Sequence, residues 1–234
     1  MSWVLANLPT IAGHLLAHLL QAVPAIIASF VLAIPIARLA RVARPLRAVL
    51  VTGSSLLYAV PSLALFVILP IILATGIRDP LNVIVALTLY GLALLVPATA
   101  DALDAVDARV LDAATAMGMG PLRCFLTVEL PLAGPAILTG LRVVTVSTIS
   151  LTTVGAVLGV RSLGWLFTDG FQRGIAAEIL TGLVSTAALA LVLDGLVLAL
   201  GRLCLPWTWE RAGTSGAAVA GAGVATSGSQ EEQA

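Results

Sequence analysis

Charged residues are scarce along this chain, and that scarcity limits the folds available to it. Of its 234 residues, 10% are charged and 59% are hydrophobic, whereas a soluble domain usually carries about 25% charged residues. This number of charges is too small to cover a water-facing surface. Lipid must therefore surround much of the chain. The formal net charge is zero, which gives no electrostatic reason to expect a nucleic-acid partner.

Five apolar stretches are long enough to cross about 30 Å of hydrocarbon at a helical rise of about 1.5 Å per residue. They cover residues 15–37, 48–75, 81–100, 131–158 and 178–201. The second and fourth stretches are longer than a span requires, so they must tilt, kink at Pro61 or Pro135, or extend beyond the bilayer. The sequence predicts an all-α integral membrane protein with about five transmembrane helices, forming one transmembrane domain over residues 1–211.

The positions of the arginines predict an orientation. Cytoplasmic loops of membrane proteins are enriched in basic residues. One set of connecting segments holds Arg38, Arg41, Arg44, Arg47, Arg109, Arg123, Arg202 and Arg211, and the opposite set holds Arg78, Arg161 and Arg173. We therefore expect a cytoplasmic C-terminus and an N-terminus outside. Residues 212–234, which are mostly small and end in an acidic run, are predicted to form a disordered cytoplasmic tail.

All twelve basic residues are arginine, and the sequence contains no lysine. A phosphate-binding Gly-rich loop requires its lysine at the nucleotide phosphates. A Schiff-base mechanism requires a lysine amine. If ATP drives this protein, another chain must bind and hydrolyse it, so we expect neither a catalytic residue nor a cofactor here.

The segment between the third and fourth stretches predicts a short helix outside the membrane. Asp107 can cap a helix over residues 108–117, and Gly118 can adopt the left-handed conformation that ends one. Pro121 is suited to begin a second short helix, and Pro131 to begin the fourth span. A helix held between two spans can dock in a groove of a soluble partner, although an ordinary interfacial connection has the same local features.

The same segment resembles the cytoplasmic motif of ABC importer permeases. In that family Glu-Ala-Ala is followed at fixed spacing by Gly, Ile and Leu-Pro, and this chain has Asp112, Ala113, Ala114, Gly118, Val128, Leu130 and Pro131 at the same spacing. Asp replaces Glu and Val replaces Ile, which preserves charge or shape. The resemblance implies that this segment is a coupling helix that docks on an ATPase subunit.

Other stretches are similar to the permeases of osmoprotectant importers, which carry glycine betaine, carnitine or choline. These stretches are residues 58–70, 112–142, 162–173 and, more weakly, 179–202. Where such permeases tend to have Arg-Asn-Thr at the end of the third span, this chain has Pro97, Ala98 and Thr99. That difference leaves the exact substrate open.

The resemblance implies a binding-protein-dependent importer in a bacterial cell membrane. Its expected partners are a cytoplasmic ATP-binding subunit, a second permease copy or homologue, an extracytoplasmic substrate-binding protein and membrane lipid. The alternatives are an ABC permease for another small solute such as an amino acid, and an ion-coupled secondary transporter. The latter usually needs internal repeats, and the sequence shows none.

Several polar residues are predicted to lie within the spans. Arg142 and Asp194 lie about 16 Å and about 12 Å from the cytoplasmic ends of the fourth and fifth spans at the helical rise, and charges at such depth are usually paired or functional. We predict an Arg142–Asp194 ion pair. Thr145, Thr148 and Thr152 share one face of the fourth span. That face predicts either a transport pathway or hydroxyl packing between helices.

Histidines and aromatic residues give weaker signals. His14 and His18 are one helical turn apart, but no third candidate ligand is close in sequence, so no metal site is expected. We expect both histidines to anchor the first span at the membrane interface. Tyr58, Tyr90, Trp165, Phe167 and Phe171 could each meet a quaternary ammonium, although aromatic residues at such positions are typically interfacial belt residues.

Overall fold

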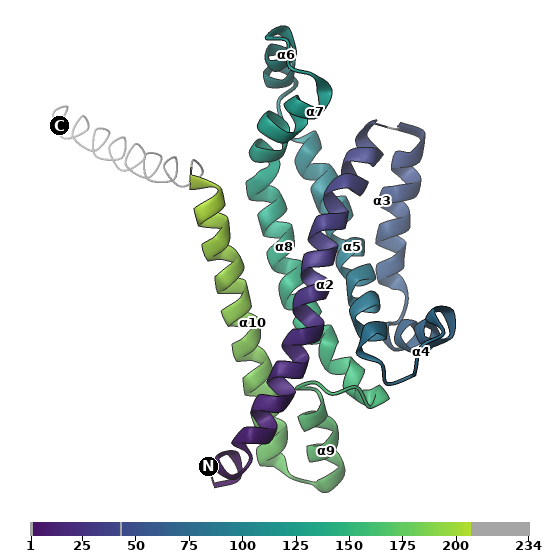
Figure 1. Ribbon diagram of the computed structural model, residues 1–234, viewed down its shortest axis with the longest axis vertical. Helices are drawn as coiled ribbons and strands as arrows, with labels where there is room; N and C mark the ends of the chain where they lie inside the picture. Colours follow the sequence, from purple (N-terminus) through teal and green to yellow (C-terminus); the bar gives the residue numbers. More distant parts are fainter. Residues whose placement is uncertain (1, 43, 207–234) are drawn as a thin grey trace, which may run out of the picture.

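The computed structural model describes residues 2–42 and 44–206, and its elements are helical throughout those residues (Figure 1). The predicted tail, residues 212–234, lies outside the described residues. The elements are α1 Ser2–Ala6, α2 Leu8–Val42, α3 Arg44–Ala59, α4 Ser62–Leu73, α5 Pro80–Asp104, α6 Ala108–Ala116, α7 Pro121–Cys124, a π-helical turn Phe125–Glu129, α8 Leu130–Thr152, a 3-10 turn Thr153–Leu158, α9 Trp165–Arg173 and α10 Ala176–Cys204.

The long helices lie side by side as a bundle, with α6 at one end and α9 at the other (Figure 1). We call these the α6 end and the α9 end. Four segments are long and apolar enough to cross a membrane: α2, α5, residues 121–158 and α10. A fifth is reached if the bent pair α3 and α4 counts as one span. The expectation of an all-α membrane protein with about five spans is therefore confirmed.

The second predicted span bends sharply, and of the alternatives offered for its excess length the kink at Pro61 is the one present. Its residues break at Pro61 into α3 and α4, whose axes differ by 108°. Proline has no N–H and disfavours helical geometry at the preceding residue, and the Tyr90 hydroxyl donates a 2.5 Å hydrogen bond to the carbonyl that the break exposes at Val60. With 16 residues, α3 is about 24 Å long, and α4 lies across the bundle near the α9 end (Figure 1).

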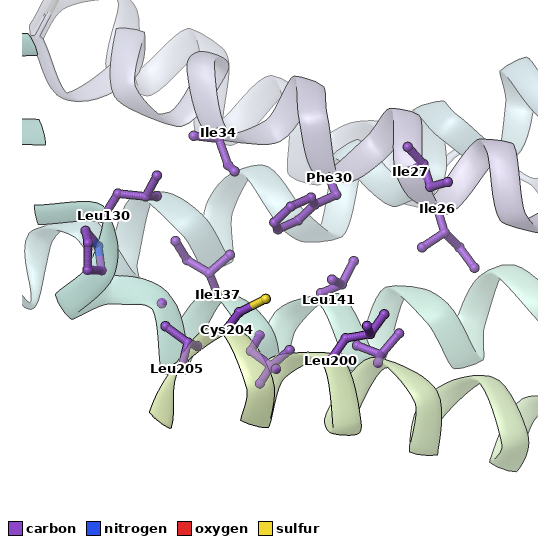
Figure 2. A pocket seen from close by; sticks show the side chains of 15 residues that line it. Ile26, Ile27, Phe30, Ile34, Leu130, Ile137, Leu141, Leu200, Cys204 and Leu205 are labelled. Carbon is purple, nitrogen blue, oxygen red and sulfur yellow. The ribbon is translucent and has the colours of Figure 1, made fainter. Parts of the chain in front are cut away.

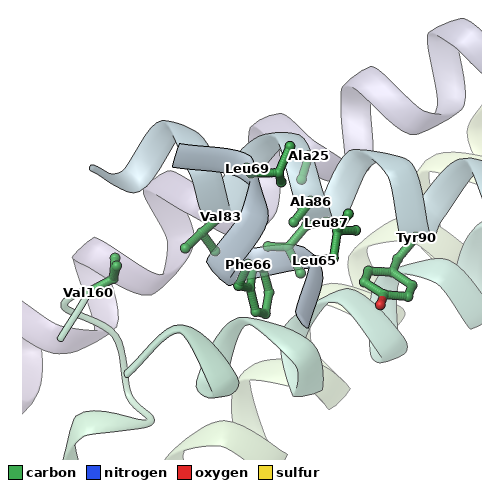
Figure 3. Close-up of a cluster of buried hydrophobic side chains, with 9 residues drawn as sticks. All are labelled: Ala25, Leu65, Phe66, Leu69, Val83, Ala86, Leu87, Tyr90 and Val160. Carbon is green, nitrogen blue, oxygen red and sulfur yellow. The ribbon is translucent and has the colours of Figure 1, made fainter. Parts of the chain in front are cut away.

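Apolar packing holds α4 in this transverse position. Leu65, Phe66 and Leu69 point from α4 towards Val83 and Leu87 of α5 (Figure 3). Phe66 is only 1% exposed. Close van der Waals packing of these side chains against α5 stabilises the transverse position of α4 after Pro61.

Small residues allow α2 to lie close to α5. Three fully buried alanines of α2, Ala25, Ala33 and Ala37, pack in clusters with side chains of α5. A Cβ placed on Gly91 of α5 would approach the Ser29 hydroxyl oxygen to 2.1 Å. That hydroxyl donates to the carbonyl of Ala25 and, at 3.2 Å, to the carbonyl of Thr88 across the interface. Small residues with bridging hydroxyls are typical of helix contacts within membranes.

The histidines of α2 are enclosed by protein, which differs from the predicted role as anchors facing the membrane interface. His14 is 7% exposed and His18 is fully buried. The imidazole of His14 stacks on the Trp165 indole of α9, with 4.8 Å between ring centroids and 9° between planes. The difference arises because α9, which folds back against α2, was not predicted as a helix. Among the described residues, no three potential His, Cys, Asp or Glu ligands are gathered for a metal ion.

Candidate functional site

The short helix expected between the third and fourth spans is present as α6. The Asp107 carboxylate accepts a 2.9 Å hydrogen bond from the backbone N–H of Arg109, which caps the helix. After Met117, Gly118 has a φ of 82°. The next N–H, at Met119, returns to the carbonyl of Ala114 at 3.2 Å, which is the hydrogen bond of a Schellman termination. The chain thus turns back towards the membrane directly after α6.

The motif residues divide into two groups. Asp112, Ala113 and Gly118 are exposed on and just after α6, whereas Ala114 is 2% exposed and faces the rest of the protein. Val128, Leu130 and Pro131 are half-buried just before and at the start of α8. Two apolar residues on the free face of α6 and at its end are also exposed to solvent, Val110 at 43% and Met117 at 72% of the residue surface. Helix α6 stands clear of the long helices (Figure 1), so these exposed small and apolar side chains are available to a partner.

The fourth span does not begin at Pro131 as predicted. Helical structure runs from Pro121 through a π-helical turn into α8. The N–H of Leu130 donates to the carbonyl of Phe125, five residues earlier. Because Pro131 has no N–H, its preceding turn loses a regular hydrogen bond, and the wider turn accommodates that loss. The segment after α6 is therefore joined to α8 without a flexible loop.

A network of charges links this segment to the other helices at the α6 end. Arg41 of α2 donates to the Glu129 carboxylate and, at 2.6 Å, to the carbonyl of Leu103. Asp104, the last residue of α5, lies 3.6 Å from Arg41 and 2.5 Å from Arg47 of α3. These side chains are 14–40% exposed, so each pair adds little stability. The network instead fixes the relative positions of four elements.

Arg38 makes a second connection between α2 and the same segment. Its guanidinium lies 3.9 Å from the centre of the Phe125 ring, and one nitrogen donates to the Pro121 carbonyl at 3.3 Å. Next to it, a cavity of about 320 Å³ is bordered by Arg38, Arg41, Leu111 and Thr115. Sequence reasoning used these arginines only for orientation. Their three-residue spacing and the acidic Glu129 before Leu-Pro were the available signals for the network.

Within the bundle, the structure brings Arg142 of α8 and Asp194 of α10 together. Two hydrogen bonds connect them, Nε to Oδ1 at 2.8 Å and Nη2 to Oδ2 at 2.7 Å. The side chains are 39% and 20% exposed. Parallel paired bonds of this kind have a defined geometry, so the pair sets the register of α8 against α10.

The three threonines of α8 lie on its buried side. Thr145, Thr148 and Thr152 are 0–2% exposed. Thr145 donates to the carbonyl of Leu141, and Thr152 to that of Thr148, both within α8. In this arrangement the hydroxyl groups of Thr145 and Thr152 satisfy their hydrogen bonds within the helix while the face packs inside the protein.

A groove between α2, α8 and α10 has different chemistry (Figure 2). Its volume is about 520 Å³. Isoleucine, leucine and phenylalanine side chains converge there, among them Ile26, Phe30, Ile137, Leu141 and Leu200 (Figure 2). Among the residues that the structure describes, no charged residue borders this groove. Such walls suit apolar chains and offer nothing to orient a charged solute.

Comparison with protein families gives one match over most of the chain. Residues 29–205 match the family described as binding-protein-dependent transport system inner membrane component. The chain is 29% identical over 197 residues to the choline transport system permease protein OpuBD of Bacillus subtilis (strain 168), covering 84% of this chain and 86% of that protein. It is also 29% identical over 178 residues to the glycine betaine/carnitine/choline transport system permease protein OpuCD of the same organism, covering 76% of each.

A third relative is longer. The chain is 32% identical over 151 residues to the ergothioneine transport permease/ergothioneine binding protein EgtU of Helicobacter pylori (strain G27). The match covers 64% of this chain and 27% of that protein. Among solved structures, a MetNI methionine ABC transporter in an inward-facing conformation aligns with a TM-score of 0.69 and 21% identity, over 84% of this chain and 94% of the other. At this level of identity, the structural likeness shows a shared fold alone.

Proposed function

The chain belongs to the family of binding-protein-dependent transport system inner membrane components, and we propose that it imports a quaternary-amine solute such as glycine betaine, carnitine or choline. It is a multi-pass membrane protein and the permease subunit of an ABC importer. The substrate proposal is supported by OpuBD and OpuCD, whose names specify choline and glycine betaine/carnitine/choline. The permease supplies a gated path and performs no bond chemistry.

Coupling is proposed to occur at α6. A separate cytoplasmic ATP-binding subunit docks on the exposed face of that helix and hydrolyses ATP. The observation that carries this proposal is the capped α6, which presents Asp112, Ala113 and Gly118 outward. From there, the continuous helix into α8 and the contacts of Arg38 and Arg41 lead to the spans. Movement of α6 relative to the bilayer would therefore displace α2 and α8 together.

The remaining partners follow from the surfaces left open. Of its 29 residues, α10 buries only Glu178, Gly182, Leu189 and Gly201 within the chain, which leaves most of this helix for lipid and for a second permease copy or homologue. An extracytoplasmic substrate-binding protein delivers the solute at the α9 end. The proposed location is the bacterial cell membrane, with the α6 end and the C-terminus in the cytoplasm and the N-terminus outside.

Uptake by the assembled transporter tests the function. The chain is reconstituted in proteoliposomes with its proposed partners, an ATP-binding subunit and a substrate-binding protein, and uptake of radiolabelled glycine betaine, carnitine and choline is measured. We expect uptake of at least one solute that requires both ATP and the binding protein. Uptake driven by a sodium or proton gradient without ATP would instead identify a secondary transporter.

Cysteine labelling tests the orientation. In a chain lacking Cys124 and Cys204, single cysteines replace Gly76, Phe171 or Gly120. Phe171 is 80% exposed, and a Cβ at either glycine meets no atom within 4 Å, so these substitutions preserve packing. In intact cells, an impermeant thiol reagent should label positions 76 and 171 but not 120. The opposite pattern would invert the proposed topology.

A further inference from the structure

A polar cavity at the α9 end lies apart from the coupling segment and from the Arg142–Asp194 pair. Its volume is about 380 Å³, within the range of about 300–1,000 Å³ that small-molecule sites occupy. The side chains of Arg78, Trp165, Thr168, Asp169 and Gln172 border it, together with residues 156–159. Both charge signs, an aromatic ring and neutral polar groups therefore face one space.

Arg78 is the cationic group of this cavity. It precedes α5, and its side chain crosses Gly159, where an added Cβ would lie 3.1 Å from the Arg78 Nε. Gly159 has a φ of 80°, a conformation that favours glycine, and this keeps the space beneath the guanidinium open. Arg78 is exposed and forms no ion pair with any described residue. Its planar donors are thus available to a carboxylate.

Asp169 and Trp165 provide the complementary chemistry on α9. Asp169 is 19% exposed, and its Oδ2 accepts a 3.0 Å hydrogen bond from Arg173 one turn later, which holds the carboxylate in place. The indole of Trp165 is held by its stacking on His14. A carboxylate and an indole ring both attract a quaternary ammonium, the indole through cation–π attraction. Both groups are fixed before any ligand arrives, which lowers the entropic cost of binding.

We propose that this cavity is a receiving site for a small zwitterion that carries a carboxylate and a quaternary ammonium. The carboxylate binds Arg78, and the ammonium lies towards Trp165 and Asp169. The proposal rests on the proposed function, because it places a quaternary-amine solute on the permease itself. In the proposed orientation the cavity opens to the outside, where a solute released by the binding protein enters before the path through the spans.

Saturation-transfer NMR on the purified full-length chain in nanodiscs, without the binding protein, tests this site. The probes are glycine betaine, which has both charged groups, and choline, which has no carboxylate. Saturation should pass to the N-methyl protons of both. Arg78→Ala should lower transfer to glycine betaine at least fivefold and transfer to choline less than twofold. The matched control is Arg161→Ala, which removes another exposed arginine at the same end that does not border the cavity.

The outcomes separate the site from the function. Equal transfer in Arg78→Ala and wild type would overturn the site, as would equal losses for glycine betaine and choline, because the carboxylate would then have no role. If Arg161→Ala lowered the transfer to glycine betaine as much as Arg78→Ala does, Arg78 would act only through non-specific positive charge, and the site would be overturned. Failure of the proposed function would appear separately, as an absence of quaternary-amine uptake by the complete wild-type transporter. The binding comparison decides the cavity whichever result uptake gives.

Discussion

Replacing Gly118 tests whether the turn after α6 couples the permease to its ATPase. Gly118 has a φ of 82°, and a Cβ there would meet no atom within 4 Å. The effect of a substitution therefore comes from backbone strain alone. For an L-residue, the left-handed conformation costs about 1–2 kcal/mol. Since about 1.4 kcal/mol corresponds to a factor of ten, the equilibrium constant for forming the docking-competent turn should fall about 5- to 30-fold.

A series at this position separates strain from other effects. Gly118→Ala and Gly118→Val introduce the strain, with the β-branched side chain the more severe. Gly118→Asn is the matched control because asparagine tolerates the left-handed region. We expect the valine variant to reach the membrane in normal amounts and to lose substrate-stimulated ATP hydrolysis and uptake by about the factor above. If its uptake equals that of the asparagine variant, the segment is only a linker.

Three further substitutions test the contacts between helices. Arg142→Ala or Asp194→Ala should lower membrane insertion or uptake by about tenfold or more, because each leaves a charge unpaired among the spans. The swap Arg142→Asp with Asp194→Arg should recover part of that loss. Additive defects without recovery in the swap would exclude an interaction between the two residues. Arg41→Ala should reduce ATP-coupled uptake by about two- to fivefold, as expected for a partly exposed pair. Combining Arg41→Glu with Glu129→Arg should restore that uptake. Failure of the combination to restore uptake would mean that the Arg41–Glu129 pair has no role. Gly91→Leu should destabilise the detergent-solubilised protein by about 1–3 kcal/mol in thermal unfolding through overpacking against α2, and an unchanged unfolding temperature would contradict the close approach of α2 and α5.

Local signals in the sequence predicted α6 well. Asp107 and Gly118 act on their own neighbours, through one capping hydrogen bond and one backbone conformation. Nothing distant is needed to place either end of the helix. The Arg142–Asp194 contact was also predictable, because depth along antiparallel spans follows from the fixed helical rise. The two depths differ by only about 4 Å at that rise, a distance that the long arginine side chain spans in the observed pair.

Features that depend on distant contacts were missed. Pro61 indicated where the apolar run over residues 48–75 could kink. The transverse position of α4 after that kink depends on packing against α5. The burial of His14 depends on Trp165, about 150 residues away in sequence, and on a helix that was not predicted. The helix continues unbroken up to Pro131 through a π-helical turn, in which the Leu130 N–H donates to the carbonyl five residues earlier instead of four. Periodicity and propensity describe near neighbours, so they carry no information on such contacts.

Cross-linking at α6 tests the coupling claim most directly. In a chain lacking Cys124 and Cys204, a single cysteine replaces exposed Ala113 on α6 and carries a short photoactivated cross-linker in membranes that contain the complete transporter. The control is the same label at Phe171 on α9, which is 80% exposed. We predict a covalent adduct with the ATP-binding subunit from position 113, and none from position 171. An assembled, transporting complex in which position 113 forms no adduct with that subunit would contradict docking at α6.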